Sequence, residues 1–305
     1  MNKKLVIFAK YLWVFFVVFF LLQYLDANFV EIKTNASVIP FANLAMAFIS
    51  LLLGKVMLSF VASLSVRYTT ARLPFFTAFS IYNLTQLAKY IPGSIWQFVG
   101  KAGAYKKEGL STNDVKNAMI LEMVYVLFSA FAFGSVILGL SDMQVVSFIY
   151  NKFQGYFYAY LVLFILLVTI GIYFRNHIKD TVVLVSGKNV LNLKMTGSLL
   201  LVWCLLGFAL FITVTPYVHS LSLFDYFSIA GLYALAYFIG FLVPFAPAGV
   251  GIREGVLIAG LSSLVSIEQA IVIASLNRFV YFFAEIIIAA LILLCKKFQK
   301  NSPLT

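Results

Sequence analysis

Apolar residues run through this chain in long blocks that short polar loops separate. The blocks lie at approximately residues 5–25, 38–64, 75–91, 117–140, 156–174, 197–217, 224–245, 255–266 and 268–295. A helix that crosses a bilayer needs about 20 apolar residues. Two blocks, 75–91 and 255–266, are shorter, and each adjoins a stretch that contains proline and glycine. The pattern predicts an all-α polytopic membrane protein with two interrupted segments.

The clearest interruption is the stretch from Pro244 to Gly255, which reads P-F-A-P-A-G-V-G-I-R-E-G. Its breaks are Pro244, Pro247, Gly249 and Gly251, and such residues cannot continue a helix. Broken backbone at membrane depth is tolerated only where it packs in protein or lines a wet cavity. A plain loop at the membrane surface is the alternative interpretation.

A similar break, at Pro92 and Gly93, is followed by Trp96 at the expected tip of a first hairpin. We interpret both breaks as tips of re-entrant helical hairpins, 75–91 returning through 92–105 and approximately 230–245 returning through 253–264. With about six spans, this layout makes residues 1–305 a single integral membrane domain. At an offset of 155 residues, Tyr82 aligns with Tyr237, Pro92 with Pro247, Gly100 with Gly255 and Ser111 with Ser266. The matches favour an inverted repeat of approximately 38–140 and 197–295, a common transporter plan.

Basic residues in the loops are distributed very unevenly across this layout. Sixteen lysines and arginines, Lys101 among them, fall on the side of the N-terminus, whereas two, Lys33 and Lys152, fall on the opposite side. Cytoplasmic loops carry such an excess of basic residues. We therefore expect a multi-pass protein of the cytoplasmic (inner) membrane with both termini in the cytoplasm.

The composition excludes several classes of function. The chain is 63% hydrophobic and 11% charged, far from the balance of a soluble domain. Its net charge of +11 is scattered and forms no basic stripe, so no nucleic acid is expected as a partner. Cys204 and Cys295 lie in apolar blocks, and His177 and His219 are isolated, so we expect no metal and no cofactor. No motif of a known catalytic site occurs, and we expect a protein that is not an enzyme.

Charged residues inside the apolar blocks are the candidates for function. They are the cations Lys55, Lys89, Arg253 and Arg278 and the acids Glu122, Glu254 and Glu285. Each charge left facing lipid at a helix centre costs roughly 2.5–3.5 kcal/mol. The four cations must therefore face carboxylates, water or an anionic ligand. Glu122 and Glu285 could neutralise two of them and Glu254 a third, so internal pairing explains the charges almost as well as ligand binding does.

Arg253 is the strongest candidate for binding a ligand. A helix that begins near Gly251 would add its free N–H groups and positive end to the guanidinium. A phosphate or carboxylate suits that combination of groups. Arg278, in the last span, could line the same cavity, and its alternative is a simple ion pair with Glu254.

Two motifs resemble a known family. Tyr90–Lys101, which reads Y-I-P-G-S-I-W-Q-F-V-G-K, is similar to the first motif of the lysylphosphatidylglycerol synthase transmembrane (flippase-like) family, and Pro247–Gly255 is similar to its second, P-G-G-x-G-x-R-E-G. The resemblance covers essentially the whole chain and implies a lipid-translocating membrane region. The chain differs at Ala248, where glycine is usual, at Lys101, where arginine is common, and at Met123, after Glu122. The aminoacyl-transferase domain of the full synthases is expected to be absent, so lysyl transfer is not implied.

The leading hypothesis is a flippase-like protein that binds or moves a lipid with an anionic phosphate head group, such as a polyprenyl-linked or other envelope glycolipid. Arg253, Arg278, Lys55, Lys89 and Lys101 would bind the head group, and Glu122, Glu254 and Glu285 would set the charge balance. One alternative is a non-catalytic subunit that scaffolds proteins of envelope-polysaccharide or lipid synthesis. Another is an enzyme that uses a lipid-linked sugar, which the lack of an acidic cluster disfavours. Neither the lipid nor the oligomeric state follows from the sequence.

Overall fold

A computed structural model describes residues 34, 37–69, 71–91, 95–141, 193–243 and 246–301 of the chain. The predicted spans 5–25 and 156–174 lie outside these residues. The described residues form two successive sets of four α-helices. The first set comprises α3 (Phe41–Arg67), α4 (Phe75–Gln86) with the 3-10 turn η1 (Leu87–Tyr90), α5 (Trp96–Lys107) and α6 (Thr112–Leu140). The second comprises α10 (Leu193–Val214) with η3 (Thr215–Tyr217), α11 (Leu223–Leu242), η4 (Pro247–Gly249), α12 (Ile252–Leu261) and α13 (Ile267–Asn301).

Five of the described helices are long and apolar enough to cross a membrane: α3, α6, α10 with η3, α11 and α13. The protein is therefore an all-α polytopic membrane protein, as predicted. The structure differs from the prediction at α11, which the sequence assigned to one arm of a hairpin. This helix has 20 residues against 10 in α12, so the two arms of the second hairpin are unequal and α11 alone has the length of a span.

Polar caps set where the long helices begin. Ser111 accepts a hydrogen bond from the Asp114 N–H at the start of α6, and Ser266 accepts one from the Gln269 N–H at the start of α13. Both caps satisfy N–H groups that have no partner within the helix. The first residues of α6 and α13 are separated by 155 residues, the offset at which the sequence motifs align.

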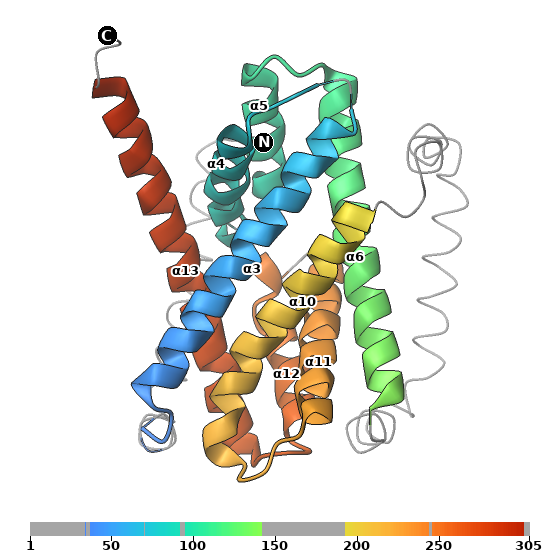
Figure 1. Cartoon of the computed structure of the whole chain (residues 1–305), viewed down its shortest axis with the longest axis vertical. Coiled ribbons are helices and arrows are strands. Elements are labelled where there is room, and N and C mark those ends of the chain that lie inside the picture. The colour runs from blue at the N-terminus through green and yellow to red at the C-terminus, as the bar shows by residue number, and fades with distance from the viewer. Residues whose placement is uncertain are drawn as a thin grey trace, which may run out of the picture.

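The two short-helix pairs point toward each other from opposite ends of the molecule. In Figure 1, α4 and α5 occupy the upper half and α11 and α12 the lower half, while α3 and α10 cross beside each other in front. The turns at the two tips, η1 and η4, are in contact. The middle of the bundle is therefore where the two breaks in the backbone meet.

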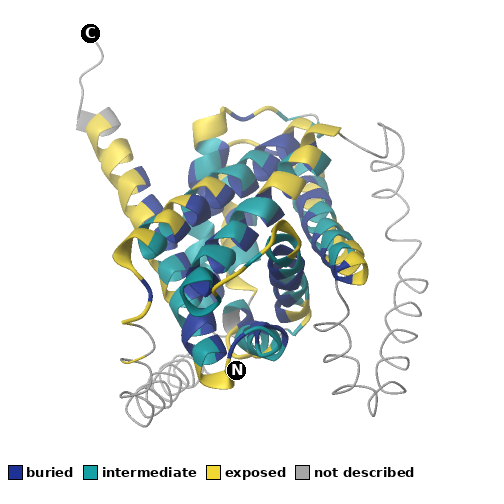
Figure 2. Cartoon of the chain, turned by 60° about the horizontal axis from the view of Figure 1, so that its bottom comes forward, coloured by how far each residue is buried: buried dark blue, intermediate teal, exposed yellow. Residues whose placement is uncertain are grey.

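Figure 2 shows where the buried and the exposed positions lie along the helices. The buried positions include charged residues as well as an apolar core, and the exposed ones include many large apolar residues. Phe41, Phe128 and Leu193 are exposed, whereas Lys55 and Glu285 are buried. This inverted distribution is expected when lipid surrounds the protein, because polar groups then find partners only within the bundle. Helices α10 and α11 approach closely at Gly207, where an added Cβ would lie 2.3 Å from the Ala230 Cβ.

Candidate functional site

A cavity of about 250 Å³ lies where the two hairpins meet. It is lined by residues of both hairpins and of the long helices α6 and α13. Four of the predicted cations line it, and each comes from a different element: Lys89 from η1, Lys101 from α5, Arg253 from α12 and Arg278 from α13. Glu122 of α6 lines the same cavity. The fold therefore gathers at one place charges that are dispersed over 190 residues of sequence.

The backbone of the second break has left-handed conformations at three nearby positions. Gly249 and Gly251 have φ angles of 70° and 83°, which glycine adopts without strain. Ala248 has a φ of 53°, the only positive φ of a non-glycine residue among those that the structure describes. In this conformation its carbonyl accepts a hydrogen bond of 2.9 Å from Nη2 of Arg278. The substitution of alanine for the glycine usual in the motif thus falls at a strained position.

Arg253 lies in the first turn of α12, two residues after the N-terminal cap Gly251, as the sequence predicted. Its side chain is buried, with 6% of the residue exposed. Among the described residues its Nη2 atom has no hydrogen-bond partner, and the arginine forms no ion pair. Instead, its guanidinium carbon lies 4.4 Å from the ring centre of Tyr233 and 5.4 Å from those of Tyr237 and Tyr281. Aromatic faces stabilise a desolvated cation but leave its charge uncompensated.

Arg278 contacts the second break from α13. Its Nε lies 3.3 Å from Oε1 of Glu254, and its Nη2 reaches the Ala248 carbonyl. Glu254 also accepts a 2.7 Å hydrogen bond from the Gly251 N–H through Oε2, so the carboxylate joins the helix cap to the ion pair. The predicted alternative for Arg278, pairing with Glu254, is present, and the arginine nevertheless lines the cavity.

Lys101 and Glu122, which both line the cavity, form a buried ion pair. The lysine Nζ lies 2.7 Å from Oε1 of Glu122 and 4.5 Å from the ring centre of Tyr82. The second carboxylate oxygen, Oε2, is buried and has no hydrogen-bond partner. Lys101 was counted with the basic loop residues from sequence; the structure corrects this, because Lys101 lies within α5 and only 4% of it is exposed.

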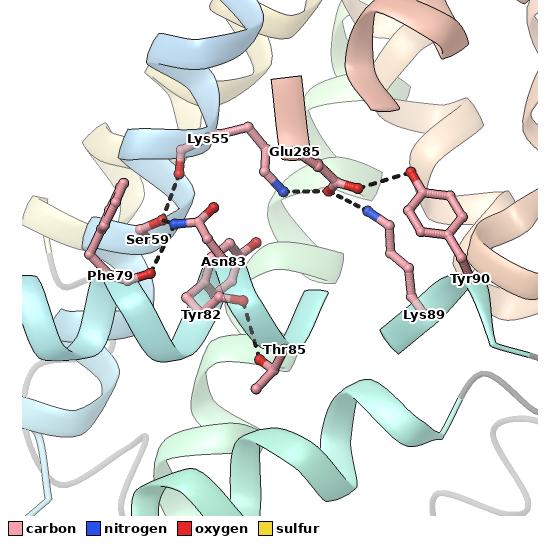
Figure 3. A network of polar contacts seen from close by, with 9 residues as sticks. All are labelled: Lys55, Ser59, Phe79, Tyr82, Asn83, Thr85, Lys89, Tyr90 and Glu285. Atoms are coloured by element: carbon pink, nitrogen blue, oxygen red, sulfur yellow. Dashed lines mark hydrogen bonds and ion pairs between the residues drawn. The ribbon is translucent and has the colours of Figure 1, made fainter. Parts of the chain in front are cut away.

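One carboxylate, that of Glu285, binds two lysines. Figure 3 shows Lys55 of α3 and Lys89 of η1 converging on Oε1 of Glu285, at 2.6 Å and 2.5 Å, while the Tyr90 hydroxyl donates to Oε2 at 2.9 Å. The Lys55 side chain is fully buried and does not line the cavity, whereas Lys89 does. The geometry therefore favours internal pairing for Lys55, which the sequence had grouped with the head-group ligands.

Apolar side chains form the remainder of the cavity wall. Those on α6 are Met119, Met123, Val126 and Leu127, and they are joined by Ile95, Phe98, Phe241 and Val243 from the two hairpins. Ile95 is 58% exposed at the outer surface. The cavity is thus lined by both cationic and apolar side chains, and one of the apolar residues, Ile95, is also exposed on the outside of the bundle.

The predicted hairpin residues differ in what the structure describes of them. Pro92, Gly93 and Pro244 lie outside the described residues. Trp96 begins α5 and is 44% exposed, and it is not part of the cavity wall. Pro247 begins η4. The described residues contain no group of three or more His, Cys, Asp or Glu side chains that could hold a metal ion.

The tyrosines around the cations were missed from the sequence, which assigned most aromatic residues to lipid-facing positions. Tyr82, Tyr233 and Tyr281 are buried, and their rings pack against lysine or arginine. Tyr237 also faces Arg253. The spacing of Tyr233 and Tyr237 could have indicated these two tyrosines, because residues four apart lie on one face of a helix.

The sequence was also compared with known families and proteins. The profile of a family described as the lysylphosphatidylglycerol synthase TM region matches residues 4–289. No curated protein matches the chain significantly.

Proposed function

The chain belongs to the family of the lysylphosphatidylglycerol synthase TM region, and from that premise and the geometry of the cavity we propose that it binds and translocates a lipid with an anionic head group. The observation that carries the proposal is the mixed lining of the cavity. Lys89, Lys101, Arg253 and Arg278 line it together with apolar side chains of α6 and of the two hairpins. A phosphate would contact the cations and a hydrocarbon chain the apolar side chains.

Arg253 is the residue that most needs a ligand in this proposal. The other three lining cations each have a carboxylate within 3.3 Å, whereas Arg253 has no carboxylate partner among the described residues, packs against tyrosine rings and has an Nη2 atom with no hydrogen-bond partner there. A buried charge that is not paired destabilises the protein unless water or a ligand compensates it. A lipid phosphate would supply charge and acceptor atoms to the guanidinium and to the N-terminus of α12 together.

The position of the cavity suits movement between leaflets. Two helical hairpins that enter from opposite faces as an inverted repeat would place the head-group site near the membrane midplane, where transporters of this plan bind their substrates. Either hairpin could then open while the other stays closed. In this proposal the protein lies in the cytoplasmic (inner) membrane with both termini in the cytoplasm, and its lipid is a glycolipid or phospholipid of the cell envelope.

A leaflet-exchange assay tests the proposal. The full chain would be reconstituted into vesicles with fluorescently labelled phosphatidic acid, phosphatidylglycerol or polyprenyl-linked sugar, and the outer-leaflet label would be quenched chemically. We expect a protein-dependent increase in the quenched fraction. The Arg253→Gln variant should lose about ten- to a hundredfold in apparent affinity, the equivalent of one hydrogen bond to a charged group. Lys116→Gln, which removes an exposed charge from the first turns of α6, is the matched control.

Absence of protein-dependent exchange for every anionic lipid would contradict the proposal. A scaffolding role in envelope synthesis would then be favoured, since four of the five central cations are in ion pairs and could serve the fold alone. In that case Arg253→Ala would destabilise the protein without changing any envelope property of cells that carry it.

A further inference from the structure

The charges around the cavity do not balance. The central cluster contains five cations, Lys55, Lys89, Lys101, Arg253 and Arg278, and three carboxylates, Glu122, Glu254 and Glu285. Counted over the described residues, its net charge is +2. We propose that the cavity selects a head group with two negative charges, a phosphomonoester or a diphosphate, over a phosphodiester, which has one. The inference rests on the proposed function and names the class of its substrate.

The two uncompensated charges have identifiable positions. One is the guanidinium of Arg253: among the described residues it has no carboxylate partner and its Nη2 atom has no hydrogen-bond partner, although 94% of the residue is buried. The other arises at Glu285, because one carboxylate shares a single oxygen between Lys55 and Lys89. Lys55 is sealed from the cavity, but Lys89 lines it. The surplus charge of this triad is therefore available to a ligand through Lys89.

A phosphomonoester matches these two positions better than a phosphodiester does. It has three terminal oxygens and carries a second negative charge above a pKa of about 6. One terminal oxygen can accept from Arg253 and another from Lys89, while the ester oxygen leads to the lipid chain beside the apolar side chains. A phosphodiester has two free oxygens and one charge, so it leaves one excess cation of the cluster without a compensating charge.

Neutral substitutions at Glu254 and Arg253 change the net charge of the cluster in opposite directions. Glu254→Gln keeps an acceptor for the Gly251 N–H, as glutamine also serves in capping boxes, and it raises the net charge of the cluster to +3. Arg253→Gln lowers it to +1. Together with the unchanged chain the two variants form a series in which the net charge of the cluster increases stepwise from +1 to +3.

Binding measurements on the purified full chain in neutral detergent test the inference. Dioctanoyl phosphatidic acid and dioctanoyl phosphatidylglycerol share their acyl chains and differ in the charge of the phosphate at about pH 8.5, well above a second pKa near 6. We expect the phosphomonoester to bind at least about tenfold more tightly, as one further charged hydrogen bond would give. This ratio of affinities should fall toward unity in Arg253→Gln, rise in Glu254→Gln and stay unchanged in the surface control Lys116→Gln.

The other possible results distinguish failure of the inference from failure of the proposed function. Equal affinities for the two lipids, or a ratio that Arg253→Gln leaves unchanged, would overturn the inference while the lipid-binding function stands. Failure of both lipids to bind would overturn the inference and the proposed function together. Competition by inorganic phosphate tests whether the site needs the lipid chain. If the affinity for inorganic phosphate equals that for dioctanoyl phosphatidic acid, the site for a dianion is supported and the role of the apolar wall is contradicted.

Discussion

The buried carboxylate of Glu285 should be the most important single charge for stability. It is the only carboxylate within 4 Å of Lys55 and Lys89 among the described residues. Removing one partner of a buried ion pair costs about 3–5 kcal/mol, because the other charge stays buried. In Glu285→Gln the Tyr90 hydroxyl can still donate to the amide oxygen, and Lys89 can be hydrated from the cavity. Lys55 has no such access, so we expect a loss of about 3–5 kcal/mol that arises chiefly from Lys55.

Equilibrium unfolding in mixed detergent micelles, followed by tryptophan fluorescence, measures this loss because Trp203 is fully buried. Glu268→Gln provides the control: it makes the same substitution at the exposed start of the same helix. Lys55→Met combined with Glu285→Gln should recover most of the loss, since a flexible apolar side chain of similar length replaces the stranded cation. The reasoning is refuted if Glu285→Gln is no less stable than Glu268→Gln, or if the double variant is less stable than the single one.

Three further predictions concern the backbone and the packing around the site, each measured by the same unfolding assay. Ala248→Gly should be neutral or stabilise by up to about 1 kcal/mol, because a left-handed alanine costs roughly 1–2 kcal/mol and the extra freedom of unfolded glycine offsets part of that gain. Gly207→Ala should destabilise by about 1–3 kcal/mol, since its Cβ would overlap Ala230 on α11. Lys101→Met and Glu122→Gln should each destabilise, and the double variant should lose less than their sum, with a coupling of roughly 0.5–3 kcal/mol.

Matched variants separate these effects from the general cost of substitution. Ala259→Gly, inside α12, should lose about 1 kcal/mol where Ala248→Gly does not. Gly197→Ala, on the same helix as Gly207 but with open space around it, should not destabilise. A loss in Ala248→Gly equal to that in Ala259→Gly, a tolerated Gly207→Ala, or additive losses for Lys101 and Glu122 would each contradict the corresponding prediction.

Local signals in the sequence predicted most helix boundaries in the described part of the chain. The serines Ser111 and Ser266 cap α6 and α13, and Gly251 precedes α12, because these residues act on backbone groups within one turn of themselves. The assignment of α11 was less successful. Its apolar block was interpreted as a hairpin arm because a break follows it, but nothing local to Leu223–Leu242 limits the helix to less than a span.

The Arg278–Glu254 pair was predicted as an alternative, but the partners of the three buried lysines could not be predicted, because they depend on how distant helices pack. Glu285 lies 230 residues from Lys55 and 196 from Lys89 in sequence. The number of carboxylates suggested that three cations could be neutralised one by one. In the structure, one carboxylate serves two lysines, and Glu122 binds Lys101, which had been placed in a loop. Only the tertiary positions of α3, α5 and α13 determine which partner each acid reaches.

The cost of burying charge is the single requirement that explains both the structure and the proposed function. It explains why Glu122, Glu254 and Glu285 each lie against a cation, and those pairs would be needed in a protein that bound nothing. Among the described residues, Arg253 lacks such a compensating carboxylate, although its guanidinium is buried beside a cavity that apolar residues also line. A structural role accounts for the pairs and leaves this arginine unexplained, so the argument for a bound anion depends on Arg253 more than on the number of cations.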